Sequence, residues 1–331
     1  MTSVPLAPAP AVGVAVGVDT LLPLVDKVPA LAAECRRHRE EPQITAAVEA
    51  WLSAIGLSDE RTHAARFGGM AARAFPETPT RDVVLFGEWL AWLFAFDDLR
   101  DDGPLGHDPD AVDRLYRDVE AVCDKGTPRG AHPVVAAFGD LWRRTAAQAG
   151  PSWRATFRHH LDDHRRACIT EARHRTLHIV PSIRDYTRLR RQANGSFMFD
   201  LAEPVLRADV PGGLRTTPAW RRLFAACNDV TAWCNDIASA RKEQALGDVH
   251  NFVLVVAYER NVDLPTAAAY VLELIVERMG DLQTAARALP AEFRRLEMTK
   301  VQSRDASRVA VTLLGAPRGH LEWLLESGRY T

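Results

Sequence analysis

The chain has few cysteines, no long hydrophobic run and almost no strand-like alternation. Its five cysteines are odd in number and show no CxxC or His-rich metal spacing, which argues against a disulfide framework and favours a reduced, cytoplasmic protein. The most apolar stretch, at 83–96, includes Gly87 and Glu88. Because it is shorter than the ~20 residues needed to span a bilayer, we expect no membrane insertion.

An excess of positive charge is also missing. The 331 residues include 41 Lys and Arg against 43 Asp and Glu, with a net charge of -2. No global basic field is present to gather nucleic acid or an acidic membrane, so a nucleic-acid partner is not expected. The apolar N-terminus lacks a basic segment and is rich in proline, and we interpret residues 1–18 as a disordered lead before a single domain at 19–331.

What the sequence does have is helical periodicity over nearly its whole length. Apolar residues recur at three- and four-residue spacing, and Gly- and Pro-rich breaks separate the periodic segments. Neither an internal repeat nor a domain linker stands out. The pattern predicts an all-α, single-domain bundle of roughly ten to twelve helices, in which the segment 83–96 is a buried core helix.

A cluster of aspartates follows this apolar segment directly, in the stretch FAFDDLRDDG at 94–103. Like charges at helical spacing are destabilising, and the C-terminal end of a helix disfavours anions further. Asp97 and Asp101 are four residues apart, so their side chains share one helix face about 6 Å apart along the axis. Together with Asp98 they can hold hard cations such as Mg²⁺. The alternative is a solvated acidic helix end.

A second polar motif lies in CNDIASARKEQALGD at 234–248. Asn235, Ser239 and Glu243 stand at i, i+4 and i+8 and offer an amide oxygen, a hydroxyl and a carboxylate on one helix face. An all-oxygen set of this kind suits Mg²⁺. The alternative is an ordinary polar face, although Ser and Asn are poor residues in the middle of a helix.

Together these motifs resemble those of the class I terpene synthases, or terpene cyclases, in their bacterial form. DDLRD resembles the aspartate-rich motif, and NDIASARKE resembles the Asn-Ser-Glu metal motif with its preceding lysine. The segment 181–195 is similar to the one that holds the diphosphate-sensing arginine with its linker and effector residues, and the chain end GRYT is similar to the C-terminal Arg-Tyr pair. Besides the metal ligands, the matching positions are Arg191, Asn194, Gly195, Lys242, Arg329 and Tyr330.

The resemblance covers about residues 25–331, in the family's order. It implies a helical bundle around an apolar cavity, a linear prenyl diphosphate as substrate, and three Mg²⁺ ions held between the two motifs. Arg191, Lys242, Arg329 and Tyr330 are then expected to donate to the departing diphosphate. Asn194 stands where many bacterial members have an aspartate, and its amide can still hydrogen-bond to Arg191. A homodimer is a further expectation.

The cavity of such an enzyme needs aromatic faces, because an allylic carbocation must be stabilised and kept from water. The candidates are Phe94, Phe96, Phe197, Phe199 and Trp323, each of which could instead belong to the plain core. Phe96, next to Asp97, is the wall residue that we select. Farnesyl diphosphate is the expected substrate because many bacterial members of this length make sesquiterpenes; geranylgeranyl diphosphate, giving a diterpene cyclase, is the alternative.

Three other functions are weighed against the sequence. A chain-elongating prenyltransferase would carry a second aspartate-rich motif, and DDHRR at 162–166 lacks its closing aspartate. A class II cyclase needs a DxDD motif, which DPDA at 108–111 fails to supply. A catalytically inactive binding protein with the same fold remains an alternative, although every position of both metal motifs is filled.

Overall fold

The protein is described by a computed structural model that covers residues 16–101 and 104–330; the side chains of Asp101, Pro104 and Tyr330 lie outside the description. The described residues form helices and no strand, which confirms the predicted all-α class. Helices of at least eight residues number eleven in this part of the chain, within the predicted ten to twelve: α3 (Glu41–Ala54), α5 (Phe67–Ala74), α6 (Thr80–Asp101), α7 (Pro109–Lys125), α8 (Pro133–Ala146), α9 (Pro151–Leu177), α10 (Ile183–Ala193), α14 (Pro218–Leu246), α15 (Phe252–Arg260), α16 (Leu264–Arg295) and α17 (Lys300–Glu326).

Short helical segments connect or flank these helices. Val16, which we assigned to the disordered lead, is 4% exposed and belongs to the hydrophobic core, so residues 16–18 are part of the packed structure. Residues 1–15 lie outside the described part. The short segments are η1 (Val18–Leu21), α1 (Pro23–Lys27), α2 (Pro29–Ala32), α4 (Glu60–Ala65), η2 (Pro104–His107), α11 (Phe197–Asp200), α12 (Ala202–Leu206), α13 (Gly212–Arg215) and η3 (Gly328–Tyr330).

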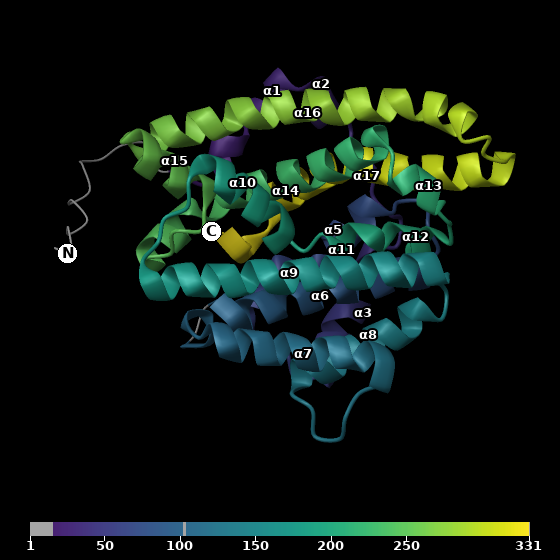
Figure 1. The fold of residues 1–331 in the computed structure, drawn as a ribbon, viewed down its shortest axis with the longest axis horizontal. Coiled ribbons are helices and arrows are strands. Elements are labelled where there is room, and N and C mark those ends of the chain that lie inside the picture. Colours follow the sequence, from purple (N-terminus) through teal and green to yellow (C-terminus); the bar gives the residue numbers. More distant parts are fainter. Residues whose placement is uncertain (1–15, 102–103, 331) are drawn as a thin grey trace.

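The long helices stack in layers around α14 (Figure 1). Helix α14 packs against both α16 and α17, and α10 bridges α9, α14 and α15. On the other side of the molecule α6 packs against α3, α5 and α8, while α17 returns to contact α5. The chain end at η3 contacts α4 and α14. This arrangement brings the ends of α6, α10, α14 and α17, which are far apart in sequence, toward one region.

Helix α6 is the predicted core helix. Its residues Trp89, Trp92 and Phe96 are fully buried, because apolar side chains cover nearly its whole circumference. The helix also packs closely on its neighbours: a Cβ at Gly87 would lie 2.7 Å from a methyl of Val48 on α3. A larger residue at this position would push the two helices apart.

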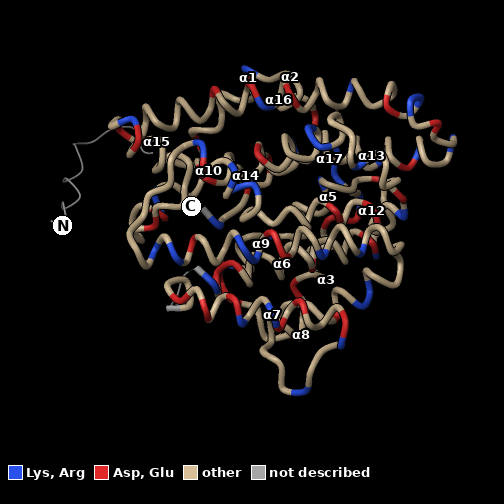
Figure 2. Tube along the Cα trace, in the orientation of Figure 1, with Lys and Arg blue, Asp and Glu red and all other residues tan. Residues whose placement is uncertain are grey.

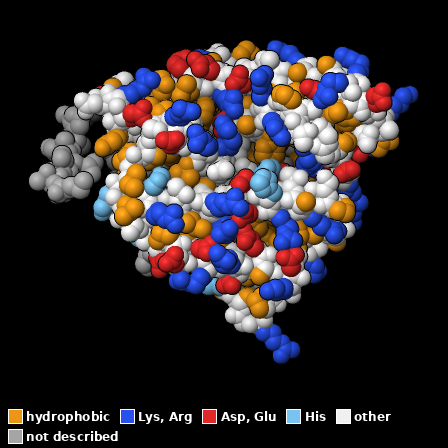
Figure 3. Space-filling model, viewed as in Figure 1, with side chains coloured by type: hydrophobic (Ala, Val, Ile, Leu, Met, Phe, Trp, Pro, Cys, Tyr) orange, Lys and Arg blue, Asp and Glu red, His pale blue; other side chains and the backbone are white. Residues whose placement is uncertain are grey.

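Charged residues are distributed over most helices in Figure 2. On the face shown in Figure 3, positive and negative side chains are interspersed, as the near-zero net charge predicts. Of the described helices, none combines the length and the apolarity that crossing a membrane requires.

Candidate active site

A pocket of about 1070 Å³, part of the solvent at its opening included, lies between α5, α6, α10, α14 and α17. Its wall is mostly apolar, and its polar residues come from both predicted metal motifs and from α10 and α17. The apolar lining includes Met70, Phe75, Phe86, Leu90, Leu93, Phe94, Met198, Phe199 and Leu313, and the polar lining is Asp97, Arg190, Asn194, Thr231, Asn235, Thr312 and His320.

One face of α6 supplies both the apolar wall and the first carboxylate. Leu90, Leu93, Phe94 and Asp97 recur at three- and four-residue spacing and all line the pocket. Phe96 is two residues from Phe94, which is about 200° around a helix. It therefore points to the opposite side.

Our selection of Phe96 as a cavity wall is therefore wrong. Its ring is 0% exposed and stacks on Trp92, with ring centroids 4.9 Å apart, and it meets Tyr116 edge-on at the same centroid distance. Of the other candidates, Phe94 and Phe199 line the pocket. Phe197 and Trp323 are buried in the core.

The two phenylalanines of α6 make a matched pair of variants. Phe94→Leu should change the ratio of reaction products, because it removes an aromatic face from the pocket. Phe96→Leu should leave that ratio unchanged and lower the free energy of unfolding by at least about 1 kcal/mol, because it leaves space in a tightly packed core. Product chromatography and urea unfolding measure the two effects. Equal product changes in both variants would show that the wall is assigned to the wrong face.

Asp97 is held in place by a buried cation of its own motif. The Arg100 side chain, 3% exposed, donates from Nη2 to Asp97 Oδ1 and from Nη1 to the Tyr116 hydroxyl, at 3.1 Å. A hydrogen-bonded carboxylate keeps a fixed orientation, which is the usual condition of a metal ligand.

Asp98 faces the end of the chain. Arg329 donates to both oxygens of Asp98, at 2.7 and 3.2 Å, and its guanidinium lies 4.7 Å from the centre of the Phe94 ring. The structure thus brings the predicted C-terminal arginine to the aspartate motif. The side chains of Asp101 and Tyr330, which we also assigned to the site, lie outside the described residues.

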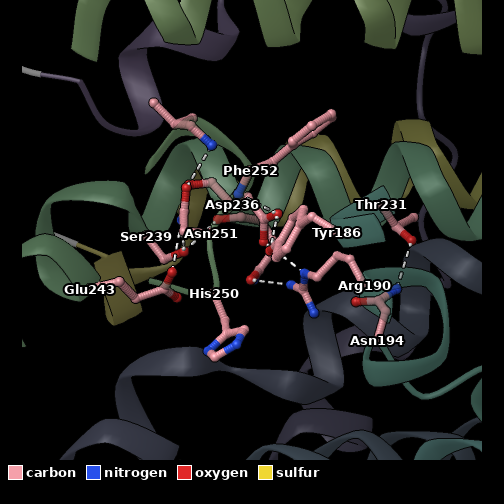
Figure 4. A network of polar contacts seen from close by, with 12 residues as sticks. Tyr186, Arg190, Asn194, Thr231, Asp236, Ser239, Glu243, His250, Asn251 and Phe252 are labelled. Carbon is pink, nitrogen blue, oxygen red and sulfur yellow. Dashed lines mark hydrogen bonds and ion pairs between the residues drawn. The ribbon is translucent and has the colours of Figure 1, made fainter. Parts of the chain in front are cut away.

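The second motif lies on α14 and is supported by the residues that follow it (Figure 4). Ser239 donates to the backbone carbonyl of Asn235 at 2.9 Å. Asn251, the N-cap residue of α15, donates to Glu243 Oε2 at 2.7 Å. Burial, together with the nearby charge of Asp236, raises the pKa of Glu243 to about 8.

These donors fit a divalent cation. Asp97, Asn235, Ser239 and Glu243 offer only oxygen ligands, and a cation beside Glu243 would favour the charged carboxylate that burial disfavours. Across the described residues, no three His, Cys, Asp or Glu side chains form a cluster that could hold an ion. The two half-sites on α6 and α14 offer oxygen ligands of the kind that Mg²⁺ binds together with water and an anionic ligand.

The arginine of α10 that lines the pocket is Arg190, whereas we predicted Arg191. Arg190 donates from Nε to Asp236 at 2.8 Å (Figure 4). It also donates from Nη2 to Asn235 Oδ1 at 3.2 Å. Arg191 instead donates twice to Asp229, both at 2.7 Å, and its side chain is 37% exposed. One residue is a turn of about 100° on a helix, so the two arginines face different directions, and of the two it is Arg190 that lines the pocket.

The helix break after α10 lies where the sequence placed it. Gly195 has φ +76°, a conformation that favours glycine, and it separates α10 from α11. Asn194 does not bind Arg191 as expected: it donates to Asn228 Oδ1 at 2.8 Å, and Asn228 in turn donates to the Arg191 carbonyl at 2.8 Å. These hydrogen bonds hold the helix break against α14.

Two further residues complete the comparison with the sequence. Lys242 is exposed on α14 and is not among the described residues that line the pocket. His320, which the sequence did not single out, does line it. Its position depends on how α17 packs across the bundle, and no local motif carries that information.

Comparisons with known proteins agree with this geometry. Residues 88–281 match the family described as "Terpene synthase family 2, C-terminal metal binding". A (-)-delta-cadinene synthase of Streptomyces clavuligerus is 33% identical over 80% of this chain and 81% of its own. A (+)-T-muurolol synthase of Roseiflexus castenholzii, named as (2E,6E)-farnesyl diphosphate cyclizing, is 32% identical over 68% of this chain and 71% of its own. The structure of wild-type cucumene synthase superimposes with a TM-score of 0.77, at 25% identity over 88% of this chain and 98% of that one.

Proposed function

The chain belongs to the terpene synthase family, and on that premise we propose that it is a sesquiterpene cyclase that ionises farnesyl diphosphate and cyclises the resulting carbocation. The observation that carries the proposal is the single pocket that contains both Asp97 and Asn235 beside an aromatic and aliphatic wall. A diphosphate fits the polar part of this pocket, and a prenyl chain fits the apolar part. The named activity of the T-muurolol synthase relative supports the C15 chain length.

The polar part would bind and orient the diphosphate. Arg190 presents a planar guanidinium that matches phosphate oxygens, and its contacts with Asp236 and Asn235 fix the direction of that group. Asp97, Asn235, Ser239 and Glu243 would hold Mg²⁺, for which we propose three ions. When bound, Mg²⁺ neutralises the charge that develops on the leaving diphosphate.

The apolar part would fold the chain and protect the cation. Phe94 and Phe199 present aromatic faces to the pocket, and each such face can stabilise a desolvated cation by about 2 kcal/mol. The cation–π contact between Arg329 and Phe94 shows that this ring already faces positive charge in the free protein.

Incubation with C10, C15, C20 and C25 prenyl diphosphates, followed by gas chromatography, tests the substrate. We expect Mg²⁺-dependent diphosphate release and a cyclic C15 product from farnesyl diphosphate. Clean conversion of the C20 substrate with failure of the C15 substrate would make the protein a diterpene cyclase. Formation of longer prenyl diphosphates would indicate a prenyltransferase, and absence of release from any substrate would favour a binding protein.

Two expectations concern the whole protein. Assembly as a homodimer stays a prediction, which sedimentation equilibrium of the full chain measures directly. The cytoplasmic location also stays a prediction, and it rests on the odd, widely spaced cysteines. All five are free thiols in the structure.

A further inference from the structure

His320 is a titratable residue inside the pocket that neither metal motif uses. It lies on α17, with Thr312 and Ala316 two turns and one turn earlier on the same pocket-lining face. The residue is 7% exposed, and its Nδ1 atom has no hydrogen-bond partner among the described residues. Buried polar atoms without a partner are rare and costly, so this one calls for an explanation.

The imidazole is held neutral and in a fixed orientation. Burial, together with the nearby positive charge of Arg190, lowers the pKa of His320 to about 4. The ring stacks on Trp323, with centroids 5.7 Å apart and an angle of 26° between the planes. A neutral imidazole carries a lone pair on one of its two nitrogens. The pocket therefore contains an organic base at neutral pH.

We infer that His320 is the base that ends the reaction by removing a proton from a carbon next to the final cationic carbon. The inference rests on the proposed cyclase function. The C–H bond breaks, its electron pair becomes the new C=C bond, and the proton moves to the unprotonated ring nitrogen. The imidazolium then gives the proton to the released diphosphate, which Arg190 would bind in the same pocket. The product is accordingly a hydrocarbon and not an alcohol.

A base this weak is sufficient for the step. A carbocation loses an adjacent proton far more readily than an imidazolium does, so proton transfer to His320 is downhill even with a depressed pKa. The low basicity also has an advantage: an imidazole that stays neutral beside Arg190 does not place a second positive charge where a carbocation must form. Asp97 is the carboxylate among the described pocket-lining residues, and it is expected to bind metal instead.

His320→Phe tests the inference because it keeps an aromatic ring of similar size and removes the base. Diphosphate release is measured alongside, so that each product is expressed per substrate molecule ionised. The share of the main olefin should fall at least tenfold, with an alcohol or other olefins in its place. An unchanged product pattern would overturn the inference. If the parent protein released no diphosphate, that result would instead contradict the proposed function.

A rescue experiment separates a base from a space-filling residue. His320→Ala leaves a gap in the pocket wall that imidazole or pyrrole, which are equal in size, can enter. Imidazole should restore the main olefin and pyrrole should not, since pyrrole has no basic nitrogen. Rescue by both compounds, or by neither, would overturn the assignment. Thermal unfolding of each variant confirms that it is folded, and His320→Ser, which leaves a similar gap, replaces His320→Ala if the alanine variant is not.

Discussion

Asn235→Ala is expected to lower kcat/KM for farnesyl diphosphate by about 10³-fold, or roughly 4 kcal/mol of transition-state stabilisation. The Asn235 amide oxygen lines the pocket with Asp97 and accepts a hydrogen bond from Arg190, so it is placed both to bind metal and to orient the arginine. Its side chain is half-buried at the pocket surface. Truncation should therefore change the free energy of unfolding by less than about 1 kcal/mol.

Gln244→Ala is the matched control, because Gln244 is an exposed amide on the same helix. It should retain parental activity. Measuring kcat/KM over a range of Mg²⁺ concentrations, with thermal unfolding in parallel, separates a binding defect from a folding defect. Near-parental activity of Asn235→Ala at saturating Mg²⁺ would contradict its role as a metal ligand.

Asp97→Ala and Glu243→Ala should be as inactive as Asn235→Ala, but Glu243→Ala should be less stable than Asn235→Ala. Glu243 accepts a hydrogen bond from Asn251, which is fully buried. Removing Glu243 leaves the Asn251 amide with fewer acceptors. We therefore expect Glu243→Ala to lower the free energy of unfolding by about 1 kcal/mol. This contact depends on the turn between α14 and α15, so the motif spacing alone does not predict the stability effect.

Arg190→Lys is expected to lower kcat/KM by at least about 10²-fold, while Arg191→Lys stays within about threefold of the parent. Lysine keeps the positive charge opposite the buried Asp236 but loses the second donor, which reaches Asn235. Arg191 donates to Asp229, away from the pocket lining. The two substitutions are chemically identical and one residue apart, so each is the control for the other.

Steady-state kinetics with thermal unfolding distinguish the two sites. Arg190→Lys should remain folded, because the lysine still places a positive charge opposite Asp236. Leaving the buried Asp236 charge without a partner would cost about 3–5 kcal/mol. The reverse pattern, with an inactive Arg191→Lys and an active Arg190→Lys, would return the diphosphate contact to Arg191 and would place the diphosphate on the other side of α10.

The features that the sequence predicted well are those fixed by local spacing. Apolar residues at three- and four-residue intervals are enough to predict the long helices, and the all-round apolar character of 83–96 identified the core helix α6. The spacing of Asn235, Ser239 and Glu243 likewise placed them on one face of α14 without knowledge of their neighbours.

The features that it missed depend on how a helix is rotated against its neighbours. Phe96 and Arg191 were chosen for their position in a motif, and each points away from the pocket. Extending the face of Asp97 back along the helix by three and four residues would have selected Phe94 and Leu93. The buried residues of α10, Tyr186 and Ala193, would similarly have favoured Arg190, which lies on the same face.

Other site residues have no local signal. His320 and Met70 reach the pocket because α17 and α5 pack together across the bundle. The pairing of Arg329 with Asp98 joins residues that are 231 positions apart in the sequence. The resemblance to terpene synthases placed Arg329 in the site, but the contact itself follows from tertiary packing.

A crystal structure with Mg²⁺ and an unreactive thiodiphosphate analogue of farnesyl diphosphate tests the central claim most directly. We expect the diphosphate to lie between α6 and α14, with Mg²⁺ bound by Asp97 on one side and by Asn235, Ser239 and Glu243 on the other. Arg190 should contact the diphosphate, and the prenyl chain should lie against Phe94. A diphosphate bound to Arg191 outside this pocket, or bound in it without metal, would contradict the account.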